Sequence, residues 1–558
     1  MTGLELEEAI RVLARTAIDR RTRWDAIDAA GGDGDFGSTL ARGMEAVLDR
    51  WERLDRSSPG RLLEGIAGIV TGEMGGSSGP LWGVAFERAG ASAGEARHFG
   101  VADVARMLGA AVEAIRECGG AQVGDKTMLD ALVPATRTVA AASADAAHVE
   151  VLERAAAAAV KGARATRDME ARRGRAAYAG TRSIGTLDAG AVAIAVIAAE
   201  LSRAAGGAEL DTSDLAADRD RPHAPEVKQF LNDPATLVFD SLRGLAAAHP
   251  DLVVWDAAQG IVSRASAPRP GQVGLVSGGG SGHEPLHAGY VGRGMLTAAA
   301  PGQVFASPSV DQLLNATRRA DAGAGVLHIV KNYTGDRMNF MLAADRAARE
   351  GIRVESVVVD DDVAIERTEQ GIGRRGTTAT VLVEKLAGAC AEDDGSLEQV
   401  MDVAQRAVGR SASFGVALTS CSSPGGGPII ELGRDEIEVG VGIHGERGRR
   451  RERIRSASEI VDEIVQTLLS ELRPATGARV LAFVSGLGST PLIEQQLVFA
   501  EVADRLSAAG LTLARSLVGP YLTALDMAGV SVTLLELDDE LEQLWDLPVV
   551  TPGLRWGA

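Results

Sequence analysis

Three loops in the second half of the chain carry side chains that could do chemistry. His283 follows the glycine-rich stretch "SGGGSG", Asp336 ends "KNYTGD", and His444 lies between glycines in "GIHGERG". An imidazole can act as a general base, a metal ligand or a nucleophile. Together the three residues could form a small polar pocket, in which one histidine adds to a carbonyl while Asp336 takes a hydroxyl proton.

Two other interpretations of these residues stay open. Histidine and aspartate are common zinc ligands, so the set could hold a metal, although it has no HxxxH spacing. A single histidine in a glycine-rich turn is, in the simplest case, a polar residue after a strand. Spacing alone does not separate a pocket, a metal set and ordinary turns.

An acidic loop in the first half indicates a possible cation site. The stretch "DAIDAAGGDGDFGSTL" places Asp28, Asp33 and Asp35 within eight positions, with glycines between them. Neighbouring carboxylates repel one another unless a cation compensates them. Hard oxygen ligands on a glycine-rich loop suit Mg²⁺, which usually also takes substrate phosphates. A solvated acidic turn with aspartate caps explains the loop equally well.

Three further glycine-rich loops in the first half favour a nucleotide. They are "MGGSSGPLWG" with Ser77 and Ser78, "GDKTMLDAL", and "RRGRAAYAGTRSIGTLDAG" with Arg175 and Arg182. Backbone N–H groups at a helix start can hold phosphate oxygens. Beside the three aspartates, these loops suggest a nucleotide bound with Mg²⁺. The chain has no GxxxxGK[ST] motif, so a P-loop NTPase is not expected.

The elements that must position these residues differ between the two halves, as expected of a multidomain chain. Up to residue 204, alanine-rich segments with helical periodicity predict an all-α domain. Residues 205–228 are rich in Asp, Gly and Pro and predict a linker. Residues 229–558 alternate β-branched runs with helical stretches, which predicts an α/β domain with a largely parallel sheet and a possible division near residue 410. Ligands of such sheets bind at the C-terminal ends of the strands.

Composition limits the partners and the compartment. The 558 residues carry a net charge of −19, which argues against binding to nucleic acid or to an anionic membrane. The three cysteines lie far apart and predict a reducing compartment. The acidic start lacks the pattern of a secretion signal, and the apolar runs are short for a membrane span. We therefore expect a cytoplasmic protein.

The motifs of both halves resemble those of the dihydroxyacetone kinases. Over about residues 229–552, "LVSGGGSGHEPLHAGYVG", "IVKNYTGDRMNF" and "VGVGIHGERG" resemble the DhaK-type substrate domain. Over about residues 5–204, "DAIDAAGGDGDFGSTL", "MGGSSGPLWG" and "AQVGDKTMLDALVPA" resemble the DhaL-type nucleotide domain, which in this family is an eight-helix barrel. The resemblance implies a kinase whose nucleotide domain precedes its substrate domain.

The resemblance also implies a role for each matching residue. His444 would bind the ketone carbonyl covalently as a hemiaminal, His283 and Asp336 would assist, and Asp336 would be the base on the primary hydroxyl. Gly280 and Lys331 would line the substrate. The metal ligands for Mg²⁺ would be Asp28, Asp33 and Asp35. The residues around ATP would be Ser38, Thr39, Ser77, Ser78, Met128 and Arg175.

The chain departs from the family pattern in three places. The substrate domain comes second, whereas it comes first in the fusion enzymes of the family. Phe36 stands where the motif GDGDHG has its histidine. The family pattern SIGHQDPG reads "SIGTLDAG" here, with Thr186, Leu187 and Ala189. The aspartates are kept, so kinase activity is still expected, while nucleotide preference and substrate range are less constrained.

The expected function is therefore ATP-dependent phosphorylation of a primary hydroxyl of a short ketose. Dihydroxyacetone is the family default, and the four-carbon ketose erythrulose is the alternative. From another class, the chain could be a substrate-binding or regulatory protein, or a phosphotransferase that depends on a phosphocarrier. The family also includes FAD-AMP cyclising lyases, and the motifs do not address that activity. Because the two active halves must meet, we expect a homodimer.

Overall fold

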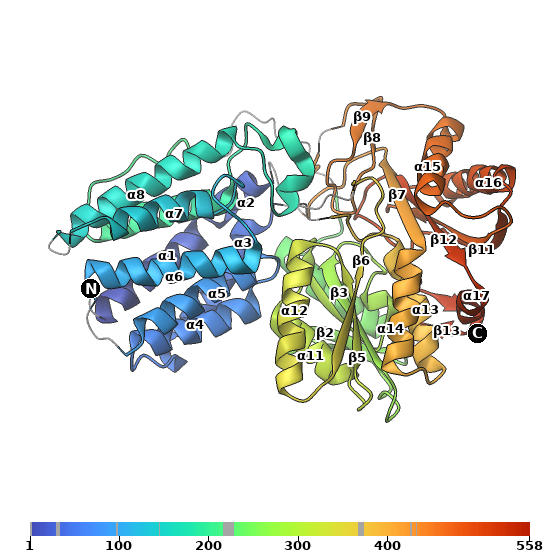
Figure 1. Cartoon of the computed structure of the whole chain (residues 1–558), viewed down its shortest axis with the longest axis horizontal. Coiled ribbons are helices and arrows are strands. Elements are labelled where there is room, and N and C mark those ends of the chain that lie inside the picture. The colour runs from blue at the N-terminus through green and yellow to red at the C-terminus, as the bar shows by residue number, and fades with distance from the viewer. Residues whose placement is uncertain are drawn as a thin grey trace. The chain divides into compact units, whose positions relative to one another are not determined.

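The computed structural model describes residues 3–29, 34–95, 99–143, 146–215, 228–366, 373–424, 427–430 and 432–557. The chain divides into two compact units, Met1–Pro222 and His223–Ala558. The first is drawn in blue to cyan and the second in green to red (Figure 1). The two units are described separately below.

The first unit is all-helical, as the sequence predicts. Its α-helices are α1 (Gly3–Asp19), α2 (Arg21–Asp28), α3 (Phe36–Asp49), α4 (Pro59–Glu73), α5 (Ser78–Ala93), α6 (Val101–Gly119), α7 (Leu129–Ala140), α8 (His148–Ala165) and α9 (Ala189–Ala204). Apart from α2, each helix packs on the next, and α9 packs on α1, which closes a ring of eight. The short α2 packs on α3 and α9 and was not expected.

The helix starts of this unit follow ordinary capping chemistry. Ser58 caps α4 by accepting a hydrogen bond from the Arg61 N–H, and Pro59 takes the first helical position. Asp188 caps α9 in the same way, with its carboxylate 2.7 Å from the Ala191 nitrogen. Asp28 ends α2 and Asp35 precedes α3. Because α2 packs on both α3 and α9, the aspartates at these three helix ends lie in one region of the unit.

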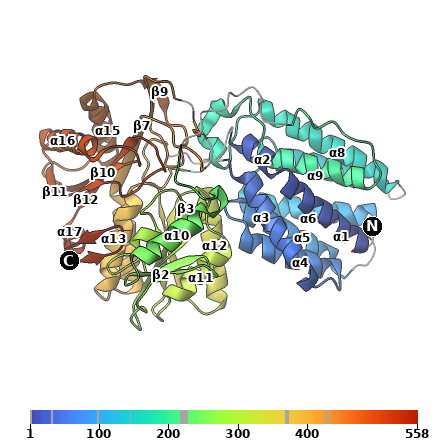
Figure 2. The ribbon, with the colours of Figure 1, turned by 180° about the vertical axis from the view of Figure 1, so that it is seen from behind.

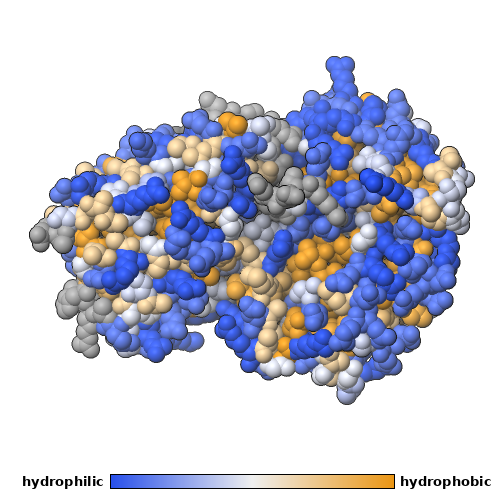
Figure 3. Space-filling model, in the orientation of Figure 1, coloured by the Kyte–Doolittle hydropathy of each residue, from blue (hydrophilic) through white to orange (hydrophobic). Residues whose placement is uncertain are grey.

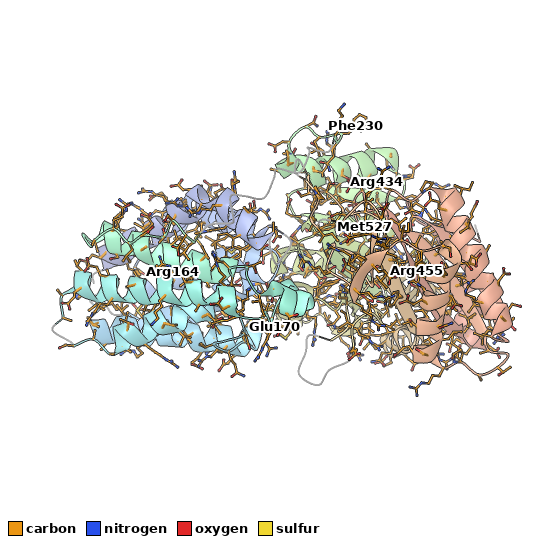
Figure 4. All side chains as sticks on the ribbon, turned by 90° about the horizontal axis from the view of Figure 1, so that it is seen from above. Arg164, Glu170, Phe230, Arg434, Arg455 and Met527 are labelled. Atoms are coloured by element: carbon orange, nitrogen blue, oxygen red, sulfur yellow. The ribbon has the colours of Figure 1, made fainter. Side chains whose placement is uncertain are left out.

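Part of the predicted linker packs on the helical unit. Leu215 is fully buried in the core that the helices share. Arg164 of α8, labelled in Figure 4, forms an ion pair with Asp214, with Nε 2.7 Å from Oδ2. Arg23 donates to the carbonyl oxygens of Thr212 and Ser213. The segment that follows α9 thus returns over α2 and α8.

The second unit contains two six-stranded sheets, which confirms the expected α/β architecture in two parts. The first sheet has the order β1-β2-β4-β3-β5-β6. Its strands are β1 (Val253–Asp256), β2 (Ile261–Arg264), β3 (Gly274–Ser281), β4 (Ala298–Val304), β5 (Val326–Lys331) and β6 (Val354–Val359). The four strands β4, β3, β5 and β6 run parallel, and β1 and β2 pair in antiparallel fashion at one edge.

The second sheet is mostly antiparallel, so the expectation of a largely parallel sheet is wrong for this part. Its order is β11-β10-β12-β7-β8-β9, and the pair β10–β11 alone is parallel within the described residues. Few residues separate β11 from β12, and a parallel return needs a crossover of a dozen or more. The strands are β7 (Ser411–Ala417), β8 (Glu436–Val439), β9 (Arg450–Arg453), β10 (Arg479–Gly486), β11 (Thr512–Gly519) and β12 (Gly529–Leu537). A separate two-stranded sheet consists of β13 (Val549–Val550) and β14 (Arg555–Trp556).

Helices cover both sheets. They are α10 (Leu237–Ala248), α11 (Val310–Ala320), α12 (Thr334–Arg349), α13 (Ala379–Glu392), α14 (Leu397–Gly409), α15 (Ala457–Leu472), α16 (Leu492–Ala508) and α17 (Asp539–Asp546). Viewed from behind, α10 lies in front of the first sheet near β2 (Figure 2). The face shown in Figure 3 is mostly hydrophilic, with apolar side chains gathered between α12 and α14.

Helix α13 belongs to the core of the whole unit. Its residues from Ala379 to Ala391 are all buried. One apolar cluster joins them to Leu327 of the first sheet and to Phe483 of the second. Two charged residues of α13, Glu384 and Lys385, are fully buried in this setting. Among the described residues, no helix has both the length and the apolar character that a membrane span requires.

Candidate active site

Aromatic side chains from three strand ends surround the His444 ring. Its centroid lies 4.7 Å from that of His283, 5.2 Å from that of Phe305 and 4.6 Å from that of Tyr333, always close to edge-on. These three residues follow β3, β4 and β5 respectively, which are parallel neighbours. Their C-terminal ends therefore meet at one edge of the sheet, where the sequence predicts a ligand.

Glu446 fixes the orientation of the His444 ring. Its carboxylate accepts a hydrogen bond from Nδ1 of His444 at 2.7 Å and another from the His444 backbone N–H at 3.0 Å. Both residues are almost fully buried. With the proton on Nδ1, Nε2 is the nitrogen that carries the lone pair. The ring is therefore held in the tautomer that can bind an electrophilic carbon through Nε2.

His283 lies against Phe305 and presents its other nitrogen to the site. The two rings stack with centroids 5.0 Å apart, and Nδ1 of His283 lies 2.8 Å from the Thr523 carbonyl oxygen. Because a carbonyl only accepts, Nδ1 carries the proton and Nε2 does not. Burial, followed by the neighbouring His444 and Lys331, holds the pKa of His283 well below its usual value. Nε2 of His283 is buried and has no hydrogen-bond partner among the described residues.

Asp336 and Lys331 form a second buried group beside these rings. Helix α12 begins directly after Tyr333, and Asp336 lies in its first turn. Oδ2 of Asp336 is 3.7 Å from Nζ of Lys331 at the end of β5. Both side chains are buried. Oδ1 of Asp336 has no hydrogen-bond partner in the described part of the chain. Buried polar atoms are rarely left unpaired, so Oδ1 and His283 Nε2 both indicate a place for a polar ligand.

Glycines in these loops make room for charged side chains. A Cβ added to Gly442 would lie 2.0 Å from Oε2 of Glu446 and 2.5 Å from Nη1 of Arg375. A Cβ on Gly279 would lie 2.0 Å from Nζ of Lys331. At the predicted substrate residue Gly280 it would lie 2.4 Å from the backbone of Phe305. These glycines thus clear space for the residues that surround His444 as well as for any ligand.

The structure brings His283 and His444 together, and it places Asp336 next to Lys331. Sequence reasoning missed Glu446, Phe305 and Tyr333. Glu446 and Tyr333 lie inside the stretches that drew attention to His444 and Asp336, so they could have been found there. Among the described residues, His283, Asp336 and His444 do not form a group that could hold a metal ion. The zinc-type interpretation of His283, Asp336 and His444 therefore receives no support.

The acidic loop of the helical unit has two of its three predicted ligands among the described residues. Oδ2 of Asp28 accepts hydrogen bonds from the backbone N–H groups of Gly34, at 2.8 Å, and Asp35, at 3.3 Å. Asp33 lies outside the described residues. Burial and the charges of Asp28 and Asp25 raise the pKa of Asp35 to about 7. A divalent cation would relieve this repulsion, and the carboxylate oxygens are the donors that Mg²⁺ prefers, so the donor set fits Mg²⁺.

A fourth carboxylate joins this acidic group from α9. Burial raises the pKa of Asp188 to about 7, and the charges of Asp28 and Asp130 add to the rise. Asp188 lies within the stretch "SIGTLDAG", whose pattern alone assigns it no role. Its position before an alanine-rich helix is typical of an N-cap residue, and Asp188 does cap α9.

The predicted nucleotide residues lie at the starts of three helices. Ser38 is in the first turn of α3, where its hydroxyl and N–H both donate to Asp25, and Thr39 beside it is buried. Ser77 and Ser78 begin α5. Met128 precedes α7 and lies against Gly190 of α9. Arg175 begins a 3₁₀ segment, Arg175–Ser183, and the positions of its side chain and that of Arg182 lie outside the described part.

Lys126 anchors the segment that carries Arg175. Its buried ammonium donates to the carbonyl oxygens of Met169 at 3.3 Å and Thr186 at 2.8 Å, and also to that of Ser183. It thus joins the loop before α7 to both ends of the 169–186 segment. Nothing in the stretch "GDKTMLDAL" predicts this role for its lysine, because the partners lie more than 40 residues away.

Comparison with known proteins places both units. Residues 243–553 match the Dak1 domain, and residues 30–203 match the DAK2 domain. A Listeria innocua protein described as the dihydroxyacetone-binding subunit DhaK of PTS-dependent dihydroxyacetone kinase 1 is 47% identical over 315 residues, which is 56% of this chain and 95% of that protein. The L-erythrulose 1-kinase of Mycolicibacterium smegmatis is 40% identical over 334 residues, which is 59% of this chain and 58% of that protein.

A solved structure shows the same relationship. The dihydroxyacetone kinase of C. freundii, in complex with AMP-PNP and Mg²⁺, aligns with a TM-score of 0.53 and 38% sequence identity. The alignment covers 59% of this chain and 61% of that chain.

Proposed function

This chain belongs to the dihydroxyacetone kinase family, and from that premise we propose that it transfers a phosphoryl group from ATP to a primary hydroxyl of a short ketose. Dihydroxyacetone is the proposed substrate. The C. freundii relative was solved with an ATP analogue, which supports ATP as the phosphoryl donor here.

The observation that carries this proposal is the pairing of a fixed imidazole with two unpaired buried acceptors. Glu446 holds His444 with its lone pair on Nε2, while His283 Nε2 and Asp336 Oδ1 lack partners among the described residues. A ketose offers one electrophilic carbonyl carbon with hydroxyl groups on either side of it. Its hydroxyl protons would satisfy both acceptors, and its carbonyl carbon would meet the imidazole.

In the proposed anchoring step, a bond forms between His444 Nε2 and the carbonyl carbon. The C=O π pair moves onto the oxygen while Nδ1 releases its proton to Glu446, and Glu446 then passes this proton through water to the oxygen and is again a carboxylate. The product is a neutral hemiaminal, and no net charge is created in the buried site. A polyol such as glycerol has no carbonyl and is not anchored, so the step also provides specificity.

In the proposed transfer step, Asp336 is the base. The primary hydroxyl loses its proton to Asp336 Oδ1 as its oxygen attacks the γ-phosphorus, and the bond to the ADP oxygen breaks. The nearby Lys331 ammonium stabilises the charge of the carboxylate before the transfer. Little other covalent work is needed, because phosphoryl transfer depends mainly on positioning and on charge neutralisation.

The helical unit is the proposed site of the nucleotide. Asp28, Asp33 and Asp35 would hold Mg²⁺, which when bound neutralises phosphate charge. Ser38, Thr39, Ser77, Ser78, Met128 and Arg175 remain the proposed residues around ATP. The described ones lie at the helix starts, where backbone N–H groups favour anions.

Erythrulose is the second candidate substrate. The erythrulose kinase of M. smegmatis is 40% identical over most of the α/β unit, and a carbonyl anchor would serve a four-carbon ketose equally well. Steady-state assays of the full chain with ATP and Mg²⁺ should compare dihydroxyacetone with both erythrulose enantiomers. The His444→Ala variant is the control for the anchor. A strict requirement for a phosphocarrier protein, or full activity of His444→Ala, would contradict the proposal.

Transfer requires the helical unit and the α/β unit to meet, and we propose that they do so in a homodimer. A mixture of two inactive variants, Asp35→Asn and Asp336→Asn, tests whether transfer can cross between copies. Recovery of activity on mixing indicates transfer between two chains. If neither mixing nor light scattering gives any sign of association, the dimer proposal fails.

A further inference from the structure

We propose that His287 and Glu384 are positioning residues that hold the Lys331 ammonium against Asp336 in the ketose site. The inference rests on the proposed function, because it takes Asp336 to be the base of the transfer step. Neither residue drew attention in the sequence, and neither belongs to the motif residues assigned above.

The four side chains form a continuous buried chain. Nζ of Lys331 lies 3.7 Å from Asp336 Oδ2 and 2.8 Å from Nε2 of His287. Nδ1 of His287 lies 2.6 Å from Oε1 of Glu384. Every member is at most 4% exposed, and the four side chains come from α12, β5, the segment after β3, and α13. Water therefore has little access to Lys331, and the protein must supply its partners.

The direction of the hydrogen bonds follows from the chemistry of the donors. An ammonium has no acceptor, so Lys331 donates and Nε2 of His287 accepts. The remaining imidazole proton is then on Nδ1 and is donated to Glu384. Each bond therefore fixes the next, and Glu384 at the far end selects the tautomer of His287 that can hold Lys331.

Backbone shape supports the same arrangement. A Cβ on Gly279 would lie 2.0 Å from Nζ of Lys331 and 3.2 Å from Nε2 of His287. The glycine therefore leaves open the space in which the ammonium meets the imidazole. Lys331 also lies 3.4 Å from the carbonyl oxygen of Gly278, so β3 contributes a second acceptor.

Several ionisable groups face this chain and share its electrostatics. Burial, followed by Lys331 and His283, holds the pKa of the His287 imidazole well below its usual value, which keeps the ring neutral. Burial raises the pKa of Glu384 to about 8, and the Lys331 charge opposes the rise. Burial, followed by the Glu384 charge and by Tyr521, raises the pKa of the nearby Tyr290 hydroxyl. Asp336 faces Lys331 from α12.

The test compares two variants with a matched control in the full chain. Glu384→Gln keeps an acceptor oxygen but removes the charge that Glu384 carries above its raised pKa of about 8. His287→Leu breaks the chain of hydrogen bonds. His328→Leu is the control, because His328 is also a buried histidine on β5. Its Nε2 lies 2.9 Å from Oγ1 of Thr317, which is not part of this cluster. The measurements are kcat and KM for dihydroxyacetone from pH 5.5 to 9.5, with melting temperatures for each variant.

We expect His287→Leu to lower kcat at least tenfold more than His328→Leu, at a similar loss of melting temperature. We expect Glu384→Gln to move the alkaline limb of the kcat profile to lower pH by about one unit, because Lys331 loses a nearby anion and gives up its proton more easily. The inference is overturned if the Glu384→Gln profile superimposes on the native one. It is also overturned if His287→Leu is no worse than the control in kcat.

A second readout does not depend on activity. In ¹⁵N-histidine-labelled protein without ATP, the His287 resonance, assigned by its loss in His287→Leu, should show a protonated Nδ1 and an unprotonated Nε2 from pH 6 to 9. A proton on Nε2 would exclude Lys331 as the donor and would contradict the inference. If the native chain phosphorylates no ketose, the proposed function fails, while this tautomer still decides the arrangement of the four residues.

Discussion

Glu446 binds His444 twice, through the imidazole Nδ1 at 2.7 Å and through the backbone N–H at 3.0 Å. The same carboxylate therefore fixes both the tautomer of the ring and the turn that carries it. A ring held through Nδ1 alone could still rotate about the bonds of its side chain. Held at both points, the ring stays among the rings of His283, Phe305 and Tyr333.

The first prediction concerns this carboxylate. Glu446→Gln keeps the shape of the side chain but removes the charge that favours a proton on Nδ1. We expect kcat/KM for the ketose to fall at least tenfold, with a change in unfolding free energy of about 1–3 kcal/mol. Glu436→Gln is the control, since Glu436 is a partly exposed acid on the neighbouring strand β8. Equal activity of the two variants would argue against the orienting role.

The second prediction tests the crowding at Gly442. A methyl group there would collide with both the Glu446 carboxylate and the Arg375 guanidinium, and both are buried. We expect Gly442→Ala to lower kcat/KM at least tenfold and to destabilise the protein by about 1–3 kcal/mol. Gly244→Ala in α10, where a Cβ meets nothing within 4 Å, should be neutral or slightly stabilising. Normal turnover by Gly442→Ala would show that the carboxylate can move without loss.

The third prediction concerns the carboxylates of the helical unit. The pKa of Asp35 is raised from 3.8 to about 7, so its ionisation lowers folding stability progressively as the pH rises from 3.8 to about 7. At pH 8 with a chelator, we expect Asp35→Asn to be more stable than native by about 1–3 kcal/mol. The same variant should keep about 1% or less of the native kinase activity.

Urea unfolding with and without Mg²⁺ measures this opposition between stability and activity. Mg²⁺ should stabilise the native chain more than Asp35→Asn. Asp49→Asn, at the exposed end of α3, should change neither property. A chelated Asp35→Asn variant that is less stable than native would contradict the mutual repulsion of these carboxylates.

The fourth prediction concerns Lys126. Lys126→Met removes an ammonium that joins Met169, Ser183 and Thr186. The segment between them carries Arg175, so we expect KM for ATP to rise at least fivefold and the helical unit to lose about 1–3 kcal/mol of stability. Lys161→Met on the exposed side of α8 is the control. If KM for ATP is unchanged in Lys126→Met, the contacts of Lys126 do not contribute to nucleotide binding.

The fifth prediction concerns His328, which should contribute to a loss of folding stability at acid pH. Burial lowers the pKa of His328 from 6.5 to about 3. Below pH 6.5 the unfolded chain takes up a proton at this histidine that the folded chain does not, so stability falls with pH between 6.5 and about 3. His283 and His287 have lowered pKa values for the same main reason and add to the slope.

The free energy of unfolding, measured in urea at pH 7, 6 and 5, should therefore decrease in the native chain. His328→Leu should reduce that slope by up to about 1.4 kcal/mol per pH unit. An unchanged slope would show that His328 takes up a proton in the folded chain as readily as in the unfolded chain.

Sequence alone predicted those parts of the site whose residues follow strands. His283 and Asp336 come after β3 and β5, and the rule for parallel sheets brings such positions together. Glu446 was passed over because an acid after a glycine resembles a solvated turn residue. Glu384 could not be found in this way, since it lies 97 residues from its partner His287 on a helix. Only the fold makes these two residues neighbours.

The fold was predicted in outline for similar reasons. Alanine-rich periodicity predicts the helical unit clearly. The short α2 begins two residues after the end of α1, so the sequence pattern does not distinguish it from a continuation of α1. Alternating strands and helices predicted the parallel strands of the first sheet. In the second sheet, β10 and β12 are also separated by a helix and a strand, yet they pair in antiparallel fashion. The alternation of strands and helices does not encode the direction in which a strand enters a sheet, whereas the short connection from β11 to β12 excludes a parallel return.

The burial of α13 has a consequence for how the α/β unit can be divided. Each sheet has an apolar cluster of its own on one face, but α13 packs into one further cluster that residues of both sheets share, so this third core is complete only when both sheets are present. Expression of residues 223–410 or 411–558 alone would expose an apolar groove or leave a helix without its cover. The two sheets should therefore melt together in a single transition, and a protease should not release either one as a stable fragment.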